Sequence, residues 1–253
     1  MEERKNMKRS EIQIDIEKIR DIAITLLYID ITPTTVPFVA THPFTDSWYT
    51  AIPKEGTPGE LKIIDLHDDK SQLEWRTALR EKIEAGSYDD ILLMLNRPYL
   101  LYFLKETQNY VSDADLAEAL RGFWTSIEYI SGDVNVKPDE MVKMFKRADK
   151  NILMSKKDKA VFDGFEEEVT LYRGVTSYNK KNKKALSWTL DYKKAVWFAK
   201  RYTSSEREVW EVTVSKKKIL CYFSSRGEKE VIIDPSNLKS KIKVHKIGDE
   251  NDK

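Results

Sequence analysis

The chain has 253 residues, of which 41% are hydrophobic and 34% are charged, and its formal net charge is +1. This length and apolar share are enough for one large globular domain or two small ones. No apolar run reaches the roughly 18 residues of a membrane-spanning helix. The opening stretch "MEERKNMKRSEIQIDIEKIR" is charged throughout and lacks the apolar core of a signal peptide. We therefore expect a cytoplasmic protein without membrane contact.

Cysteine and histidine are scarce. Cys221 is the only cysteine, so no disulfide can form within the chain, as is usual for the reducing cytoplasm. His42, His67 and His245 have no cysteine or histidine partners at the spacing of metal ligands. We expect no metal site.

The charge is unevenly distributed along the chain. Residues 1–169 carry 23 basic and 32 acidic side chains, a net charge of −9, whereas residues 170–253 carry 20 and 10, a net charge of +10. A basic part of this kind can steer an anionic partner toward the protein. Two other interpretations remain open, namely that the two parts attract each other or that the charge serves solubility.

The first half of the sequence is mostly helical in pattern. Apolar residues recur at helical spacing in the first thirty residues. Residues 31–60 contain five prolines and several aromatic residues, which predicts an extended and irregular stretch. A short strand over 61–66 is followed by expected helices over 71–85, 88–107, 112–130, 138–149 and the stretch "KDKAVFDGF".

From residue 168 onward the pattern becomes that of strands. "EEVTLYRGV", "KALSWT", "EVWEVTVS", "KILCYF", "KEVIID" and "SKIKVHKI" read as strands, with one helix over "LDYKKAVWFAKRY". Helices first and strands afterwards indicate an α+β protein.

Arg173 and Gly174 end the first of these strands. Arg173 shares a strand face with Val169 and Leu171, because successive side chains alternate. Its guanidinium group suits phosphate oxygens, and Gly174 lets another group approach the backbone closely. A simple turn is the alternative interpretation.

A second polar cluster, Ser187-Trp188-Thr189, lies at a corner between a strand and a helix. A hydroxyl there can orient a carboxylate, or Thr189 can act as the N-cap of the helix. The third cluster is Glu228-Lys229-Glu230, at the entrance to an apolar strand. Strand alternation puts Glu228 and Glu230 on one face, where they form either a solvated edge or a working pair.

These three clusters, in this order, resemble the R-S-E class of mono-ADP-ribosyltransferases, which includes clostridial binary-toxin and C3-like enzymes. The resemblance rests on "LYRGV", on "LSWT" with the "AVWFA" helix, and on "RGEKEVII". It covers about 169–247, and helices from about 88 to 168 fit the helical part of that fold. It implies an ADP-ribosyltransferase fold, with a helical N-terminal part and a two-sheet, strand-rich core that binds NAD.

The implied domains are an extension over 1–70, containing a helix and the proline- and aromatic-rich stretch, and a transferase domain over 71–253. The latter divides into a helical lobe, 71–168, and an NAD-binding core, 169–247. The extension either wraps the helical lobe or binds a partner.

The resemblance also implies roles for single residues. Glu230 would stabilise the positive charge that develops on the ribose as NAD loses nicotinamide, and Ser187 would hold Glu230 in place. Arg173 would bind the phosphates of NAD, and the backbone of Gly174 would meet the nicotinamide amide. Glu228 would meet the acceptor, together with the preceding loop "YFSSRG".

Two further residues join the expected NAD site. Thr189 lies beside Ser187, and Arg207 lies where the family has a loop over the pyrophosphate. NAD is then a co-substrate, and the family needs no metal.

In the family that the sequence resembles, a glutamate at this position is typical of enzymes that modify arginine, so Glu228 favours arginine of a protein as the acceptor of ADP-ribose. A nucleic acid remains open because the part from residue 170 is basic. Such an enzyme acting in its own cell suggests a toxin with an antitoxin or inhibitor protein, an anti-phage system, or a phage effector. An NAD glycohydrolase, which uses water as the acceptor, and a non-catalytic binding module on the same fold are the alternatives.

Overall fold

The computed structural model describes residues 13–54, 56–57, 59–124, 135–182, 185–202, 206–236, 238 and 242–248. The chain divides into two compact units, Met1–Ser112 and Asp113–Lys253. The sequence placed a boundary at residue 70 instead. The division lies further along because the first helix packs against the helices that follow residue 70.

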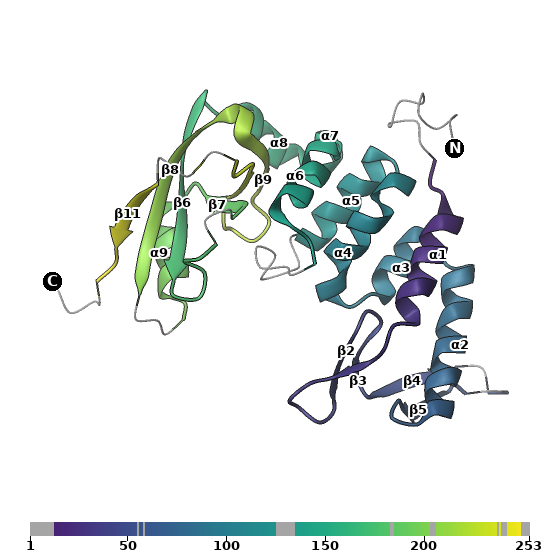
Figure 1. Cartoon of the computed structure of the whole chain (residues 1–253). Helices are drawn as coiled ribbons and strands as arrows, with labels where there is room; N and C mark the ends of the chain where they lie inside the picture. Colours follow the sequence, from purple (N-terminus) through teal and green to yellow (C-terminus); the bar gives the residue numbers. More distant parts are fainter. Residues whose placement is uncertain are drawn as a thin grey trace. The chain divides into compact units, whose positions relative to one another are not determined.

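Four helices build most of the N-terminal unit: α1 (Ile16–Leu27), α2 (Asp69–Ala85), α3 (Tyr88–Met94) and α4 (Arg97–Thr107), the last followed by the 3-10 turn η3 (Gln108–Tyr110). Helix α1 begins after Asp15, whose side chain accepts a hydrogen bond from the backbone N–H of Lys18. It buries Ile19, Ala23 and Leu27 and packs against the other three helices (Figure 1). The expected N-terminal helix is therefore present, over Ile16–Leu27 of the described residues.

One helix was expected over 88–107, and the structure has two. Helix α3 ends at Met94, Leu95 and Asn96 are extended, and α4 begins at Arg97 with Pro98 in its first turn. Proline has no N–H to donate to the carbonyl four residues earlier, so it suits a helix start and interrupts a continuing helix. Pro98 therefore explains the break.

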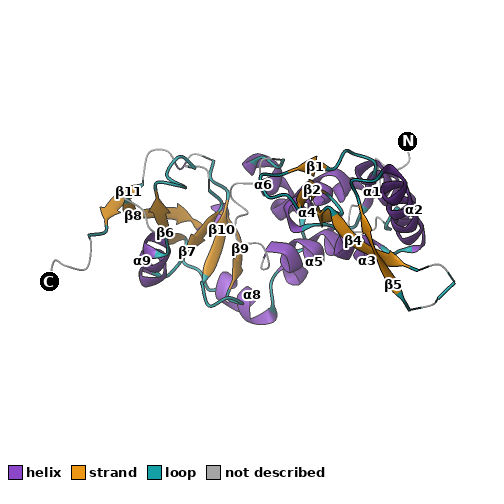
Figure 2. Ribbon diagram, turned by 90° about the horizontal axis from the view of Figure 1, so that it is seen from below, coloured by secondary structure: helices purple, strands orange, loops and turns teal. Residues whose placement is uncertain are grey.

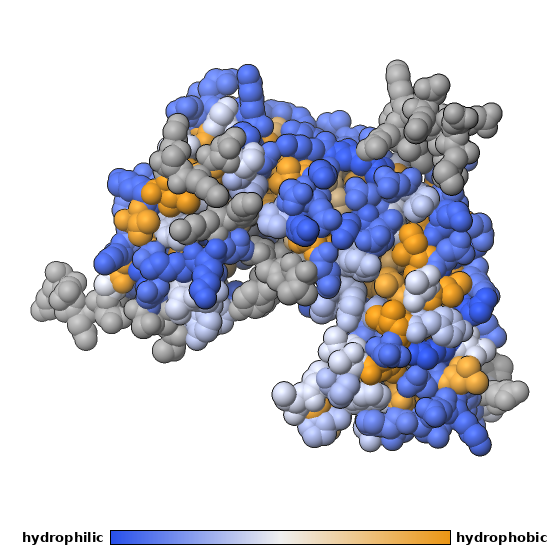
Figure 3. Space-filling model, in the orientation of Figure 1, coloured by the Kyte–Doolittle hydropathy of each residue, from blue (hydrophilic) through white to orange (hydrophobic). Residues whose placement is uncertain are grey.

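The proline-rich stretch contains short strands. A three-stranded sheet has the order β1-β2-β3, and a hairpin pairs β4 with β5. The strands are β1 (Thr32–Pro33), β2 (Val39–His42), β3 (Thr45–Ser47), β4 (Tyr49–Pro53) and β5 (Leu61–Asp65). Leu61 and Ile63 on β5 are 67% and 79% exposed, and Figure 3 shows apolar patches on the surface of this unit. The expected extended segment and the expected strand over 61–66 are both present.

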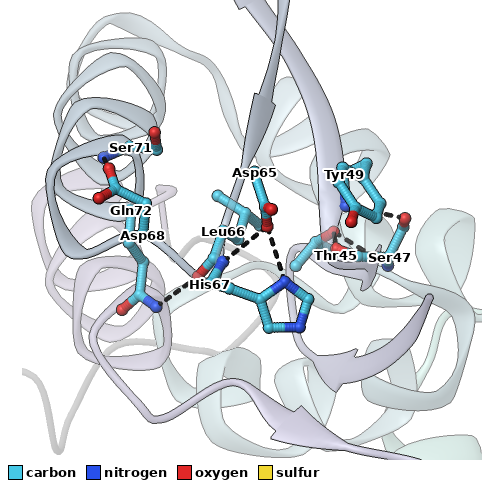
Figure 4. A network of polar contacts seen from close by, with 9 residues as sticks. All are labelled: Thr45, Ser47, Tyr49, Asp65, Leu66, His67, Asp68, Ser71 and Gln72. Atoms are coloured by element: carbon cyan, nitrogen blue, oxygen red, sulfur yellow. Dashed lines mark hydrogen bonds and ion pairs between the residues drawn. The ribbon is translucent and has the colours of Figure 1, made fainter. Parts of the chain in front are cut away.

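Polar contacts fix the connection from the hairpin into α2 (Figure 4). Asp65 accepts hydrogen bonds from the backbone N–H of His67 at 2.9 Å and contacts its ring Nδ1 at 2.7 Å. The imidazole also stacks on Trp48, with 4.2 Å between ring centroids. Asp68 then accepts from the N–H of Ser71 and caps α2. His67 thus has a structural role here.

The C-terminal unit begins with helices and continues with strands. Its helices are α5 (Asp113–Trp124), α6 (Pro138–Arg147), α7 (Lys150–Leu153), α8 (Lys156–Asp163) and α9 (Tyr192–Lys200). Its strands are β6 (Glu168–Thr176), β7 (Ser187–Thr189), β8 (Arg207–Ser215), β9 (Ile219–Phe223), β10 (Glu230–Ile233) and β11 (Lys243–Lys246), with the 3-10 turn η5 (Lys216–Lys218). Residues 125–130 of the helix expected over 112–130 lie outside the described residues.

These six strands form one sheet with the order β11-β8-β6-β7-β10-β9 (Figure 2). A core of two sheets was expected. The two three-stranded halves are hydrogen-bonded neighbours through β6 and β7, but only the pair Tyr172 and Thr189 links them. Strand β7 is only three residues long, which limits how far the two halves can pair. The α+β class is confirmed.

Helices cover the two halves of the sheet differently. Helix α9 packs on β6 and β8, whereas α6 and α8 pack against β9. Strands β9 and β10 are buried along their whole length, with Cys221 and Val231 fully enclosed. Burial on this scale fixes the strands, so side chains at their ends are held by a rigid element. No helix in the described parts of the chain is long and apolar enough to cross a membrane.

Candidate active site

Ser187 joins Arg173 and Glu230. Its hydroxyl Oγ donates to Glu230 Oε1 at 2.5 Å, and its backbone carbonyl accepts from Arg173 Nη1 at 2.7 Å. In the register of β7 and β10, Ser187 lies opposite Ile232, so Glu230 is its diagonal neighbour on the same face. Three residues that lie far apart in the sequence thus meet in one arrangement.

Glu230 is the buried acid of this arrangement. It opens β10, its side chain is 7% exposed, and Oε1 accepts a second hydrogen bond from the indole Nε1 of Trp124 at 3.1 Å. Burial raises the pKa of Glu230 above its ordinary value, while Ser187, Trp124 and Arg226 oppose that rise. The carboxylate is therefore poorly solvated and rigidly held.

Arg173 is the partly buried cation of this arrangement. Burial lowers its pKa to about 10, and the nearby Glu230 opposes the shift, so the guanidinium group stays charged at neutral pH. Its Nε is buried and has no hydrogen-bond partner among the described residues. Buried donors of this kind are normally satisfied. An anion beside Arg173 would supply the missing acceptor.

The sequence pattern predicted that strand alternation puts Glu228 and Glu230 on one face. In the structure a turn brings Glu228 near Glu230 instead. Strand β10 starts only at Glu230, and Lys229 has a left-handed φ of 47°. Gly227 is also left-handed, with φ of 65°. The expectation that the two acids share a strand face was wrong, because Glu228 lies before the strand begins. Both acids contact Arg226.

Arg226 contacts both acids through one atom. Its Nη2 lies 3.1 Å from Glu228 Oε2 and 3.5 Å from Glu230 Oε2. The side chains of Arg226 and Glu228 are 32% and 21% exposed, so this contact lies at the solvent side of buried Glu230. One cation thus offsets the repulsion between two neighbouring carboxylates.

Gly174 is required by helix packing. A Cβ added there would lie 2.4 Å from the carbonyl oxygen of Ala195 and 2.6 Å from the backbone N of Ala199, both in α9. The close approach expected at this glycine is therefore made by the chain's own helix. A Cβ at position 174 would lie on the face of the sheet that α9 covers, so the side chain of Arg173 lies on the opposite face.

Thr189 stabilises the loop that carries Glu228. Its buried hydroxyl donates to the backbone carbonyl of Glu228 at 2.6 Å and accepts from the N–H of Asp191. The N-cap of α9 is Asp191, not Thr189, which had been the alternative interpretation. Thr189 therefore helps to hold the loop that positions Glu228.

Arg207 lies on the other side of the sheet from Arg173. It opens β8 opposite Thr176, whereas Arg173 is opposite Trp210. Since facing residues share a face and successive residues alternate, Arg207 and Thr176 lie on the face that α9 covers. The structure brings Arg173, Ser187, Glu228 and Glu230 together, and Arg207 is not part of that group.

Sequence reasoning missed two residues that contact the acids. Trp124 precedes Glu230 by 106 residues, and no local pattern marks it as a hydrogen-bond donor to that acid. Arg226 is part of the stretch "RGEKEVII" on which the resemblance rests, but an exposed arginine in a loop does not by itself indicate a functional residue. Its spacing of two and four residues from the acids was the available hint.

The comparisons with known proteins add no relative. No family model matches the chain, and neither a curated protein nor a solved structure matches it.

Proposed function

We propose that the C-terminal unit is a mono-ADP-ribosyltransferase, which cleaves NAD between nicotinamide and ribose and transfers ADP-ribose to a macromolecule. One observation carries the proposal. A buried carboxylate, Glu230, is fixed by two hydrogen-bond donors and is linked through Ser187 to Arg173, whose buried Nε has no hydrogen-bond partner among the described residues. The residues also occur in the order on which the resemblance to the R-S-E enzymes rests, with Arg173 on β6, Ser187 on β7 and Glu230 at the start of β10.

Glu230 has the role of stabilising charge. When the bond between nicotinamide and ribose breaks, nicotinamide leaves with the bonding electron pair, and positive charge develops on the ribose. A carboxylate that is already oriented and shielded from water stabilises such a charge strongly. Ser187 and Trp124 hold the carboxylate so that no reorganisation is needed during the reaction.

Arg173 has the role of holding the phosphates of NAD. Its Nη1 is committed to the carbonyl of Ser187, which leaves the buried Nε as a donor for a phosphate oxygen. Binding of the phosphates by Arg173 would fix the position of the ribose relative to Glu230. Such positioning can account for a large part of the rate enhancement of a bimolecular reaction. This requirement fits a dinucleotide better than a neutral sugar.

Glu228 has the role of meeting the acceptor. It is more exposed than Glu230 and already contacts a guanidinium group, that of Arg226. A carboxylate that orients a guanidinium group and takes up its proton suits arginine in a protein as the acceptor. A nucleic acid is the second acceptor class, which the net charge of +10 in residues 170–253 favours.

The test uses wild type and Glu230→Gln with NAD labelled in its adenylate part, incubated with a cell lysate. We expect nicotinamide release and a labelled macromolecule with wild type, and a loss of roughly 10²–10³-fold with Glu230→Gln. Protease or nuclease treatment of the product then identifies the acceptor class. Nicotinamide release without any transferred label would show a glycohydrolase. No release by a folded wild-type protein would show a binding module.

A further inference from the structure

The loop that carries Arg226 is anchored at both ends. At its start, Asp158 accepts hydrogen bonds from the backbone N–H and the hydroxyl of Ser224, at 3.1 and 2.5 Å. At its end, Thr189 bonds the carbonyl of Glu228, and the N–H of Leu190 donates to the carbonyl of Lys229. Only three residues, 225–227, lie between the two anchors. The side chain of Arg226 is thus confined near the acids.

Inside this loop, the guanidinium group of Arg226 lies beside both acids. Its Nη2 is 3.1 Å from Glu228, the acid assigned to the acceptor, and 3.5 Å from Glu230, the acid assigned to the ribose. A group that contacts both carboxylates lies close to the carbon that Glu230 would stabilise. The short tether also gives it a high effective concentration at that point.

We propose that Arg226 is an internal acceptor, so that the enzyme ADP-ribosylates itself once, on this side chain. The inference rests on the proposed cleavage of NAD. A bond forms between Nη2 of Arg226 and the anomeric carbon of the ribose, and the bond from that carbon to nicotinamide breaks. Nicotinamide leaves with the electron pair, and the guanidinium proton passes to Glu228 or to water. No further reactant is required.

The nearest alternative within the site is Arg173, and it is a poor acceptor. Its Nε is buried, and its Nη1 already donates to the carbonyl of Ser187. Arg226 is one-third exposed and lies between the two acids. Modification should therefore fall on Arg226 alone, and one adduct should then cover the acids and hinder an external acceptor.

The first experiment incubates the purified full chain with labelled NAD and no other acceptor. We expect about one ADP-ribose per chain, located on Arg226 by peptide mapping, with released nicotinamide measured separately. Arg226→Lys should lose this label. A matched control is Arg201→Lys, because Arg201 is an exposed arginine of the same unit whose guanidinium group lies over Trp197. That variant should keep the label.

The second experiment tests whether the transfer is internal. Glu230→Gln keeps the acceptor and lacks the acid, whereas Arg226→Lys keeps the acid and lacks the acceptor. When the two variants are mixed, an internal reaction leaves both unlabelled at position 226. The labelled fraction of wild type at a fixed time should also be independent of protein concentration.

The outcomes separate this inference from the proposed function. Nicotinamide release without label on Arg226, or label on the Glu230→Gln chain in the mixture, overturns the internal acceptor and leaves NAD cleavage standing. No nicotinamide release from folded protein overturns both.

Discussion

Ser187 holds Glu230 by its side chain and Arg173 by its main chain. Its Oγ lies 2.5 Å from Glu230 Oε1, and its carbonyl oxygen lies 2.7 Å from Arg173 Nη1. A substitution at Ser187 removes the first contact and can leave the second in place. The two roles proposed for the site, stabilising the ribose and holding the phosphates, can therefore be separated at one residue.

Ser187→Ala should lower kcat about 10–100-fold, because the buried carboxylate loses one of its two fixed donors. The KM for NAD should change little, since the contact to Arg173 uses the main chain. The lost hydrogen bond had lowered the pKa of Glu230, so the acid limb of the rate profile should move to higher pH. Ser187→Thr keeps the hydroxyl and should restore much of the rate. Wild-type kcat and pH profile in Ser187→Ala would contradict the role of Ser187.

Trp124→Phe should impair activity through Glu230. Phenylalanine keeps the aromatic contact with Phe145 but has no N–H to donate to Glu230 Oε1. We expect a loss of about 10–100-fold in kcat and a shift of the acid limb to higher pH.

The matched control for Trp124→Phe is Trp188→Phe. The indole N–H of Trp188 is also buried, but it donates to the backbone carbonyl of Ala185. Both variants lose one buried indole hydrogen bond, so both should lose about 1–2 kcal/mol of unfolding free energy. Only Trp124→Phe should move the pH profile of kcat. Equal shifts in the two variants would mean that the contact to Glu230 is not specific.

Glu230→Gln should raise the stability of the unit at neutral pH. Burial raises the pKa of Glu230, so the folded state ionises at higher pH than the unfolded state. This group therefore loses its contribution to stability as pH rises from the ordinary glutamate pKa through the raised one. Glutamine does not titrate and can still accept from Ser187 and Trp124.

The expected increase in Tm with Glu230→Gln is largest near pH 7.5, shrinks as pH falls from the raised pKa of Glu230 toward the ordinary glutamate pKa, and is absent below the ordinary pKa. Thermal unfolding followed by tryptophan fluorescence measures it. The control Glu166→Gln neutralises an exposed side chain and should show no comparable gain. A destabilised Glu230→Gln at pH 7.5 would contradict the conclusion that burial of the charged carboxylate lowers stability.

Gly174→Ala should destabilise the C-terminal unit by about 1–3 kcal/mol or more. The new methyl group would meet backbone atoms of Ala195 and Ala199 at 2.4 and 2.6 Å, and a helix backbone yields less readily than a side chain. Gly122→Ala is the matched control, because nothing lies within 4 Å of a Cβ added there in α5. It should stabilise the unit by about 0.5–1 kcal/mol. Denaturant unfolding of the two variants separates steric conflict from helix propensity.

Local patterns in the sequence were enough for most of the described elements and for the elements that carry the predicted site residues. Ser187 and Thr189 occur on a short strand before a helix, and Glu230 opens an apolar strand, as expected. Predictions from the sequence were wrong where a contact with a distant part of the chain decides the local structure. Asp191 is the cap because Thr189 turns its hydroxyl to the carbonyl of Glu228, which is 39 residues away.

The loop before Glu230 shows the same limit. Alternation along a strand predicted that Glu228 and Glu230 share a face, but Lys229 takes a left-handed conformation. Such a conformation costs a non-glycine residue about 1–2 kcal/mol, and no propensity favours it for lysine. Anchors at Thr189 and Leu190, which belong to another part of the chain, hold this turn.

The sequence by itself determined the α+β class, the strand positions of Arg173, Ser187 and Glu230, and the acidic pair at residues 228 and 230. Those features follow from periodicity and from residue chemistry, which act over a few positions. Only the tertiary structure decided that Trp124 donates to Glu230 and that Arg226 lies between the acids. Contacts of that kind depend on packing between distant segments, where burial removes water and makes each remaining hydrogen bond and charge matter more.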